Sequence, residues 1–229
     1  MKSLNKVCIL AAIAVTSIAQ NAQSAVLLPI TNPSFENPVL APGAFVAGNI
    51  GWTSASVTQN IFAQGSVADS FNLPSGPNVA ALSYNESISQ TLSSSLAEGD
   101  YVLSAYFAQN IFAPTSFPFQ LQLFAGTTLL TEFSIIPTTT LTQYSTLYTA
   151  LGSDDDLGQS LKIVINASFG TDFAAFQQTF VDGVSLSYTA VPEPGTATML
   201  FVAGLLSVCF IRFQQIRRQR IASNQVETK

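Results

Sequence analysis

Apolar and polar residues alternate in short stretches through the middle of the chain. Residues 101–107 are apolar at every odd position, and residues 119–123, 161–165 and 184–188 alternate in the same way. A period of two is typical of strands that bury one face. Turn sequences such as residues 74–77 (PSGP) separate these stretches, and we find no convincing amphipathic helix between them. The pattern therefore predicts β structure almost throughout this region.

The spacing of the turns favours short antiparallel strands in a single domain. Residues 26–190 form a segment long enough to bury one core, and about eight to ten strands fit into it. An open sheet of that size would leave exposed edges, whereas two packed sheets cover one another. We predict an all-β domain, a jelly-roll β-sandwich, over residues 26–190.

The N-terminal end follows a different pattern. Lys2 and Lys6 precede an uninterrupted apolar stretch at 7–18, and the small residues Ala22, Ser24 and Ala25 come next. This order is typical of a secretory signal peptide. We predict a signal-peptide helix within residues 1–25, with cleavage after Ser24 or Ala25.

The C-terminal end contains a second apolar stretch, residues 196–211, which carries no charge. With its neighbours it predicts a single transmembrane helix at 195–213, roughly 28 Å long at ~1.5 Å per residue. The basic tail 212–229 follows, and its arginines favour retention on the cytoplasmic side. These basic residues are Arg212, Arg217, Arg218 and Arg220. A plain membrane anchor behind a proline-containing linker would show the same features.

Prolines precede the apolar stretch and keep the backbone around Glu193 extended and accessible. The five residues concerned are Val191, Pro192, Glu193, Pro194 and Gly195. Together with the apolar stretch and the arginines, this motif resembles the PEP-CTERM sorting signal of Gram-negative bacteria at residues 191–229. The resemblance implies an exosortase as processing partner. It also implies a transient stay in the inner membrane, followed by release to an exopolysaccharide-rich cell surface or biofilm matrix.

Charge and composition exclude several functions for residues 26–190. This segment carries eleven acidic residues and one basic residue, Lys162, so it cannot neutralise phosphates and nucleic-acid binding is excluded. The chain has no histidine, and its two cysteines, Cys8 and Cys209, lie in the two terminal segments. The segment therefore lacks a disulfide, a thiol nucleophile and the commonest general base. On these grounds we predict a protein that is not an enzyme and has no catalytic residues.

Several short motifs along the same segment resemble those of galactose-binding-like jelly rolls, a group that includes carbohydrate-binding modules. The motifs are residues 32–36 (NPSFE), 51–52 (GW), 88–92 (ISQTL), 99–103 (GDYVL) and 180–186 (FVDGVSL). The resemblance implies a polysaccharide as partner. Exposed aromatic rings could stack on sugar rings, and the candidates are Trp52, Tyr84, Tyr106 and Phe112.

Asp182 raises a separate question of charge. Counting in twos from Phe180 to Leu186 places Asp182 on the apolar face, unless a bulge at Gly183 shifts the register. A carboxylate there needs backbone N–H groups, a proton or a metal cation. The resemblance implies that a structural calcium ion would lie between Glu36 and Asp182. A carboxylate capped by turn amides is the alternative.

These observations lead to one functional prediction and one alternative. We predict an exported, non-catalytic surface or matrix protein that an exosortase sorts through its tail. The alternative is a permanently anchored single-pass protein whose outward domain is a carbohydrate-binding module.

Overall fold

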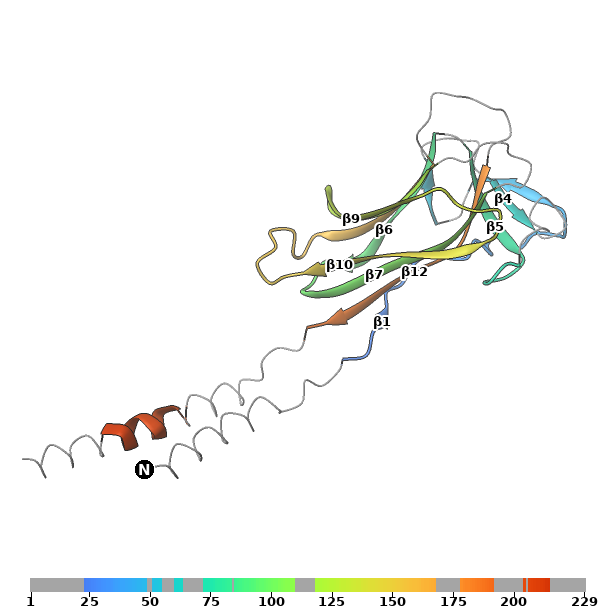
Figure 1. The fold of residues 1–229 in the computed structure, drawn as a ribbon. Coiled ribbons are helices and arrows are strands. Elements are labelled where there is room, and N and C mark those ends of the chain that lie inside the picture. Colours follow the sequence, from blue (N-terminus) through green and yellow to red (C-terminus); the bar gives the residue numbers. More distant parts are fainter. Residues whose placement is uncertain are drawn as a thin grey trace, which may run out of the picture. The chain divides into compact units, whose positions relative to one another are not determined.

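The computed structural model describes residues 23–48, 51–54, 60–63, 72–83, 85–109, 118–167, 178–191, 204 and 206–214. The chain divides into two compact units, residues 24–191 and the two terminal segments 1–23 and 192–229. The described part of residues 24–191 consists of strands and their connections (Figure 1). No helix within the described ranges is long and apolar enough to cross a membrane.

The strands form two antiparallel sheets. Sheet A has the order β10-β7-β12-β5-β4-β2, and β1 pairs with the C-terminal part of β12. Sheet B has the order β3-β6-β11-β8-β9. The strands are β1 (Val26–Leu27), β2 (Phe45–Ala47), β3 (Thr53–Ser54), β4 (Asn60–Ala63), β5 (Asn78–Ser83), β6 (Glu86–Ser95), β7 (Gly99–Gln109), β8 (Phe119–Ala125), β9 (Thr128–Ile135), β10 (Thr142–Ala150), β11 (Ser160–Ala167) and β12 (Gln178–Ala190).

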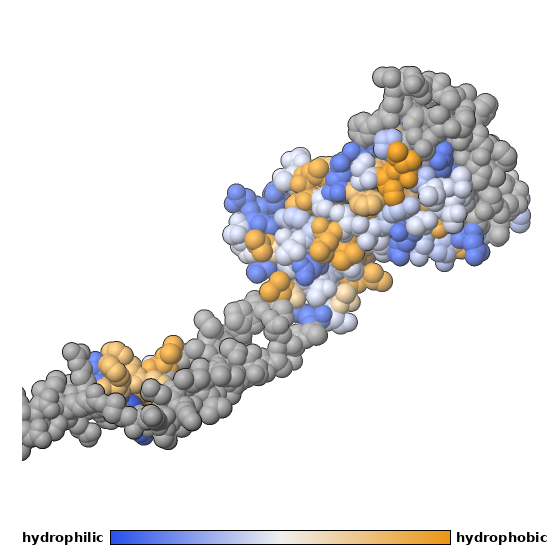
Figure 2. All heavy atoms as spheres, viewed as in Figure 1, coloured by the Kyte–Doolittle hydropathy of each residue, from blue (hydrophilic) through white to orange (hydrophobic). Residues whose placement is uncertain are grey.

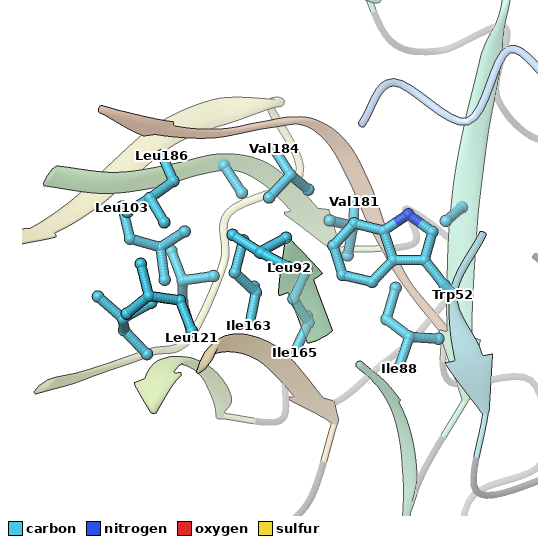
Figure 3. Packing of buried hydrophobic residues seen from close by; sticks show 14 of the residues in the cluster. Trp52, Ile88, Leu92, Leu103, Leu121, Ile163, Ile165, Val181, Val184 and Leu186 are labelled. Carbon is cyan, nitrogen blue, oxygen red and sulfur yellow. The ribbon is translucent and has the colours of Figure 1, made fainter. Parts of the chain in front are cut away.

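The inner faces of the two sheets share one hydrophobic core, so the predicted all-β sandwich is confirmed. The alternating stretches of the sequence lie in β7, β8, β11 and β12, and their alternating apolar positions are buried except Tyr188, which is partly buried. In Figure 3 the side chains of both sheets meet between the ribbons, and Trp52 lies at one end of the cluster beside Ile88 and Val181. Burial of these apolar surfaces supplies the main stabilisation of the fold.

Strand β12 changes its buried face at Gly183. Val181, before this residue, and Val184 and Leu186, after it, all pack in the core between the sheets. The register against β7 shifts between Asp182 and Ser185, and Gly183 has a φ of 56°, a conformation that favours glycine. The bulge therefore occurs, and it places Asp182 on the outer face of sheet A instead of in the core between the sheets.

Six strand ends meet at one end of the sandwich, which we call the distal end. Strands β5, β7 and β11 finish there, at Ser83, Gln109 and Ala167, while β6, β8 and β12 begin there. The pairing of β12 with β5 and β7, and of β11 with β6 and β8, brings these ends together.

Some large apolar side chains are exposed on the surface of the domain. On the face shown in Figure 2 they form separate patches.

Much of the two terminal segments lies outside the described residues. Of the helix expected at 195–213, the structure describes residues 204 and 206–213, which are helical, and Arg212 lies in this helix. Val191 follows β12 and is 45% exposed. The signal peptide up to residue 22, the motif residues Pro192, Glu193, Pro194 and Gly195, and the arginines Arg217, Arg218 and Arg220 lie outside the described ranges.

Candidate functional site

Glu36 and Asp182 lie close together, 146 positions apart in the chain. The loop that contains Glu36 is held against β12, because the Val184 N–H donates to the Pro33 carbonyl at 2.9 Å. The loop before β5 covers both acids. A side chain at Gly76 would overlap the Glu36 carboxylate, and a Cβ at Gly183 would lie 2.8 Å from Ser75 Oγ.

The same loop is also tied to sheet B. The Gln90 side chain accepts a hydrogen bond from Thr31 N at 2.7 Å and donates to the carbonyls of Thr31 and Gly51 at 2.9 and 2.7 Å. Gln90 lies on the buried face of β6, so these bonds satisfy its amide group inside the fold. They fix the backbone that leads into Glu36.

Asn78, the first residue of β5, completes the group of polar residues. Its backbone N–H donates to Glu36 Oε1 at 3.0 Å, and its side-chain Nδ2 donates to the carbonyls of Phe35 and Pro38 at 3.1 and 3.0 Å. The side chain is fully buried. We call Glu36, Asn78 and Asp182 the carboxylate cluster.

Two side-chain oxygens of this cluster, Asn78 Oδ1 and Asp182 Oδ2, are buried and have no hydrogen-bond partner among the described residues. Burial raises the pKa of Asp182 to about 7, although the backbone amides of Gly183 and Ser75 partly oppose the shift; the charge on Glu36 adds to it. Burial also raises the pKa of Glu36, against the hydrogen bond from Asn78. Without a cation, Asp182 therefore holds a proton at pH values where an ordinary aspartate has lost it.

The oxygens of the carboxylate cluster fit a hard cation. Calcium binds carboxylate, amide and backbone carbonyl oxygens together, and two buried oxygens without partners are available here beside the Glu36 carboxylate. In the described ranges, no three or more His, Cys, Asp or Glu residues are grouped so that they alone could hold a metal ion. A calcium ion would therefore be bound by two carboxylates and by neutral oxygens.

Of the aromatic residues predicted to stack on sugars, the structure describes Trp52 and Tyr106, and these two do not share a surface. Trp52 is a core residue: its ring packs 5.7 Å from that of Phe35, its Nε1 donates to the Asn32 carbonyl at 3.2 Å, and 6% of the residue is exposed. Tyr106 is half-buried on the outer face of sheet A, opposite Asp182 in the ladder. Tyr84 and Phe112 lie outside the described residues.

Two buried polar residues escaped the sequence analysis. Asn78 follows the turn at 74–77, which was recognised as a turn, but nothing in the local pattern indicates that its side chain reaches Phe35 and Pro38. Glu86 is 2% exposed at the start of β6, and its Oε2 accepts a hydrogen bond from Ser83 N at 2.7 Å. The alternation of β6, whose even positions 86–92 are buried, is the one signal that could have found it.

The structure resembles solved cyclases. A Stig cyclase, Fisc, from Fischerella sp. TAU in complex with (3Z)-3-(1-methyl-2-pyrrolidinylidene)-3H-indole is 22% identical, with a TM-score of 0.62 over 74% of this chain and 100% of that one. The apo form of a cyclase from Fischerella sp. is 25% identical, with a TM-score of 0.62 over 74% of this chain and 99% of the other. Carbohydrate-binding modules with β-sandwich folds also occur among the similar structures, at TM-scores of 0.41 to 0.44.

The domain is a β-sandwich, and its fold is similar to that of solved cyclases. The family model of the HpiC1 cyclase matches residues 26–187, nearly the whole sandwich, and the chain therefore belongs to the HpiC1-like family. No curated protein matches the chain. The family match ends before the tail at 191–229 and does not bear on the sorting signal.

This membership corrects two predictions. A non-catalytic surface or matrix protein, and its alternative, an anchored carbohydrate-binding module, are both wrong, because the family and the similar structures are those of cyclases. The exclusion of an enzyme rested on the absence of histidine and cysteine from the domain. That argument removes cysteine nucleophiles and imidazole bases, but it leaves proton transfer by carboxyl groups available.

Proposed function

We propose that this protein is a cyclase that closes a ring on an apolar, indole-bearing substrate. The observation that carries the proposal is the family match over residues 26–187. The indole class is supported by two similar cyclase structures, one with the ligand named above and one with 4-(1H-indol-3-yl)butan-2-one.

The residues of the domain limit the chemistry by which such a ring can close. A side-chain alkene that is protonated becomes a carbocation, and the π electrons of a second double bond or of the indole ring form the new C–C bond. Loss of a proton then restores a neutral product, so the reaction is an isomerisation. Because the chain has no histidine and the domain has no cysteine, its carboxyl groups are the natural proton carriers.

The carboxylate cluster has a structural role in this proposal. Glu36, Asn78 and Asp182 would hold a calcium ion, and its positive charge would compensate the negative charge of the buried carboxylates. These residues join the loop around Glu36, the loop before β5 and the bulge of β12. The ion would thereby stabilise three segments that are far apart in sequence.

The experiment for the cyclase proposal uses the purified full-length chain and indoles that carry alkenyl side chains of different lengths. We expect products of unchanged mass with a shifted chromatographic retention time and one ring more by NMR, and none with heat-denatured protein. We also expect 4-(1H-indol-3-yl)butan-2-one to bind and to inhibit. Absence of both isomerisation and binding across the series would contradict the proposal.

We further propose that the cyclase is exported, with an exosortase acting on its tail. Support comes from the sequence alone: a signal-peptide pattern at 1–25 and the motif at 191–195 before an apolar stretch and arginines. Intact-mass spectrometry of the protein from its own host, with medium and membrane fractions kept separate, tests this. A mature chain that starts near Ala25 and ends near Gly195 is expected, and a full-length chain in the cytoplasm would contradict export.

A further inference from the structure

We propose that the outer face of sheet B is a second binding surface, for a neutral polysaccharide. It is separate from the proposed ring closure, because the hydrophobic core lies between this face and sheet A, whose outer face carries Asp182. Strands β6, β11, β8 and β9 form the face, and the structure describes each of them over its full length. The outward side chains of β8, β9 and β11 are exposed or half-buried, so a ligand can reach them.

Strand alternation decides which side chains this face carries. In β8, in β11 and in the first part of β6, every second residue is buried in the core and the residues between them point outward. Across the sheet, Asn166 of β11 pairs with Gln120 of β8, and Gln122 of β8 pairs with Glu132 of β9. Neighbouring strands are about 4.8 Å apart, so these four polar side chains lie next to one another on three adjacent strands.

Hydrogen bonds join the four side chains into one group, which we call the amide row. Gln120 Nε2 donates to Glu132 Oε1 at 3.0 Å, and Gln122 Nε2 donates to Glu132 Oε2 at 2.6 Å. Gln120 Oε1 accepts from Gln122 Nε2 and from Asn166 Nδ2, both at 3.4 Å. Each amide is thus oriented by a neighbour on the sheet. A ligand that binds here meets groups whose positions are already fixed, which lowers the entropic cost of binding.

The amide row keeps hydrogen-bonding capacity for a ligand. A primary amide offers two N–H donors and one carbonyl acceptor. Gln120 Nε2 and Asn166 Nδ2 each donate one of the bonds described above, so each has a second N–H left. Ser89, on the same face of β6, adds a hydroxyl that can donate and accept. Sugar hydroxyls also donate and accept, so this arrangement of donors and acceptors matches a polyhydroxylated chain.

The charges on this face fit a neutral ligand. Lys162 of β11 and Glu132 of β9 have opposite signs, and the other acids of the described ranges lie in sheet A, in loops or in the core. A polyanion would find a single ammonium group here, which is too little for electrostatic binding. A polycation would find a single carboxylate, whose two oxygens already accept hydrogen bonds from Gln120 and Gln122.

An aromatic ring lies beside the amide row. Phe124 is half-buried on the outward face of β8 and pairs with Lys162 of β11. It follows Gln122 by two positions on the same strand, a separation of about 7 Å. An aromatic ring can stack on the apolar face of a sugar ring while amides bind the hydroxyls at its edge. The surface would thereby attach the cyclase to a polysaccharide without taking part in the ring closure.

Affinity electrophoresis of the full-length chain tests this surface. Native gels contain dextran, xylan, laminarin or galactomannan as neutral polysaccharides, and alginate serves as the polyanion. We expect at least one neutral polysaccharide to retard the wild type, with little dependence on salt, and alginate to have no effect. Absence of retardation by all four neutral polysaccharides, or retardation by alginate alone, would overturn the inference.

Site variants locate the binding. Gln122→Ala removes the side chain that donates to both Glu132 and Gln120, and it should weaken the affinity for the retarding polysaccharide about 10-fold or more. Phe124→Ala should weaken it as well, through the lost stacking contact. Gln143→Ala, a matched change at an exposed glutamine on the outer face of sheet A, should bind as the wild type does.

The melting temperature of each variant separates binding from folding. Gln122→Ala should melt close to the wild type, because the side chain lies on the outer face of the sheet. Wild-type affinity in folded Gln122→Ala, or an equal loss in Gln143→Ala, would overturn the inference. Should Gln122→Ala not fold, Asn166→Ala, at the other end of the amide row, must show the weaker affinity, and wild-type affinity in that variant would overturn the inference.

Discussion

At the scale of single residues, Asp182 is a buried side chain whose negative charge requires compensation. It is fully buried, one of its oxygens has no hydrogen-bond partner among the described residues, and its pKa is raised from 3.8 to about 7. Lys162, the one basic residue of residues 26–190, lies on β11 in the other sheet. A proton or a cation must therefore compensate the charge.

The first prediction concerns the pH dependence of stability without calcium. The pKa of Asp182 is raised in the folded state, so its favourable contribution is complete below pH ~4 and is lost as the pH rises through about 7. At ~1.4 kcal/mol per pKa unit, the loss is about 4 kcal/mol. Urea denaturation in the presence of a chelator should show this decline for the wild type and a clearly smaller decline for Asp182→Asn, in which the raised pKa of Glu36 still contributes.

Calcium should remove the decline, because the ion replaces the proton on Asp182. Added calcium is expected to raise the free energy of unfolding of the wild type near pH 8 and to leave Asp182→Asn much less affected. Asp155→Asn, a change at an exposed aspartate, is the matched control and should behave as the wild type. An equal calcium response in Asp182→Asn and in the wild type would contradict a site at the carboxylate cluster.

At the scale of secondary structure, the bulge of β12 decides where Asp182 lies. A regular strand would have placed Asp182 in the core between the sheets, where the count from Phe180 to Leu186 puts it. Gly183 makes the shift possible because its φ of 56° is strained for other residues and because Ser75 and Tyr106 leave no room for a Cβ. The bulge therefore moves a carboxyl group from the core between the sheets to the carboxylate cluster.

The second prediction tests this bulge by comparing two glycines. Gly158→Ala introduces a side chain at a φ of 85° with no atom within 4 Å, and it should cost about 1 kcal/mol through backbone strain alone. Gly183→Ala adds contacts of 2.8 Å to Ser75 and 3.1 Å to Tyr106 and should cost about 1–3 kcal/mol more. Denaturation of both variants measures the difference, and equal losses would show that packing at the bulge is loose.

At the scale of the whole molecule, the sandwich is a compact unit that ends where the tail begins. Residues 24–191 cluster separately from the two terminal segments, and the family match covers most of the same range. Both sheets and the shared core lie inside this unit. Its stability should therefore not depend on the segments outside it.

The third prediction follows for a truncated chain. A protein limited to residues 24–191 should unfold in one cooperative transition, with a melting temperature within about 2 °C of that of the full-length chain. Calorimetry of the two chains under the same calcium concentration provides the comparison. A large loss of stability in the shorter chain would mean that the terminal segments contribute to the fold.

Alternation along the sequence was sufficient to predict the β-sandwich, because strand periodicity is local and the residues of β7, β8, β11 and β12 carry it themselves. The meeting of Glu36 with Asp182 followed only from the resemblance to galactose-binding-like motifs, since two acids far apart carry no local signal of contact. Asn78 was missed for the same reason, because its role depends on which backbone groups the loops bring next to it. The burial of Glu86, in contrast, could have been found from the alternation of β6.

The sequence by itself determined the strand pattern, the acidic domain without histidine or cysteine, and the distinct composition of the two ends. The tertiary structure decided which face Asp182 occupies and which oxygens surround it. The physical reason is that these contacts join segments up to 151 positions apart, through a register shift and loop hydrogen bonds that no local pattern encodes.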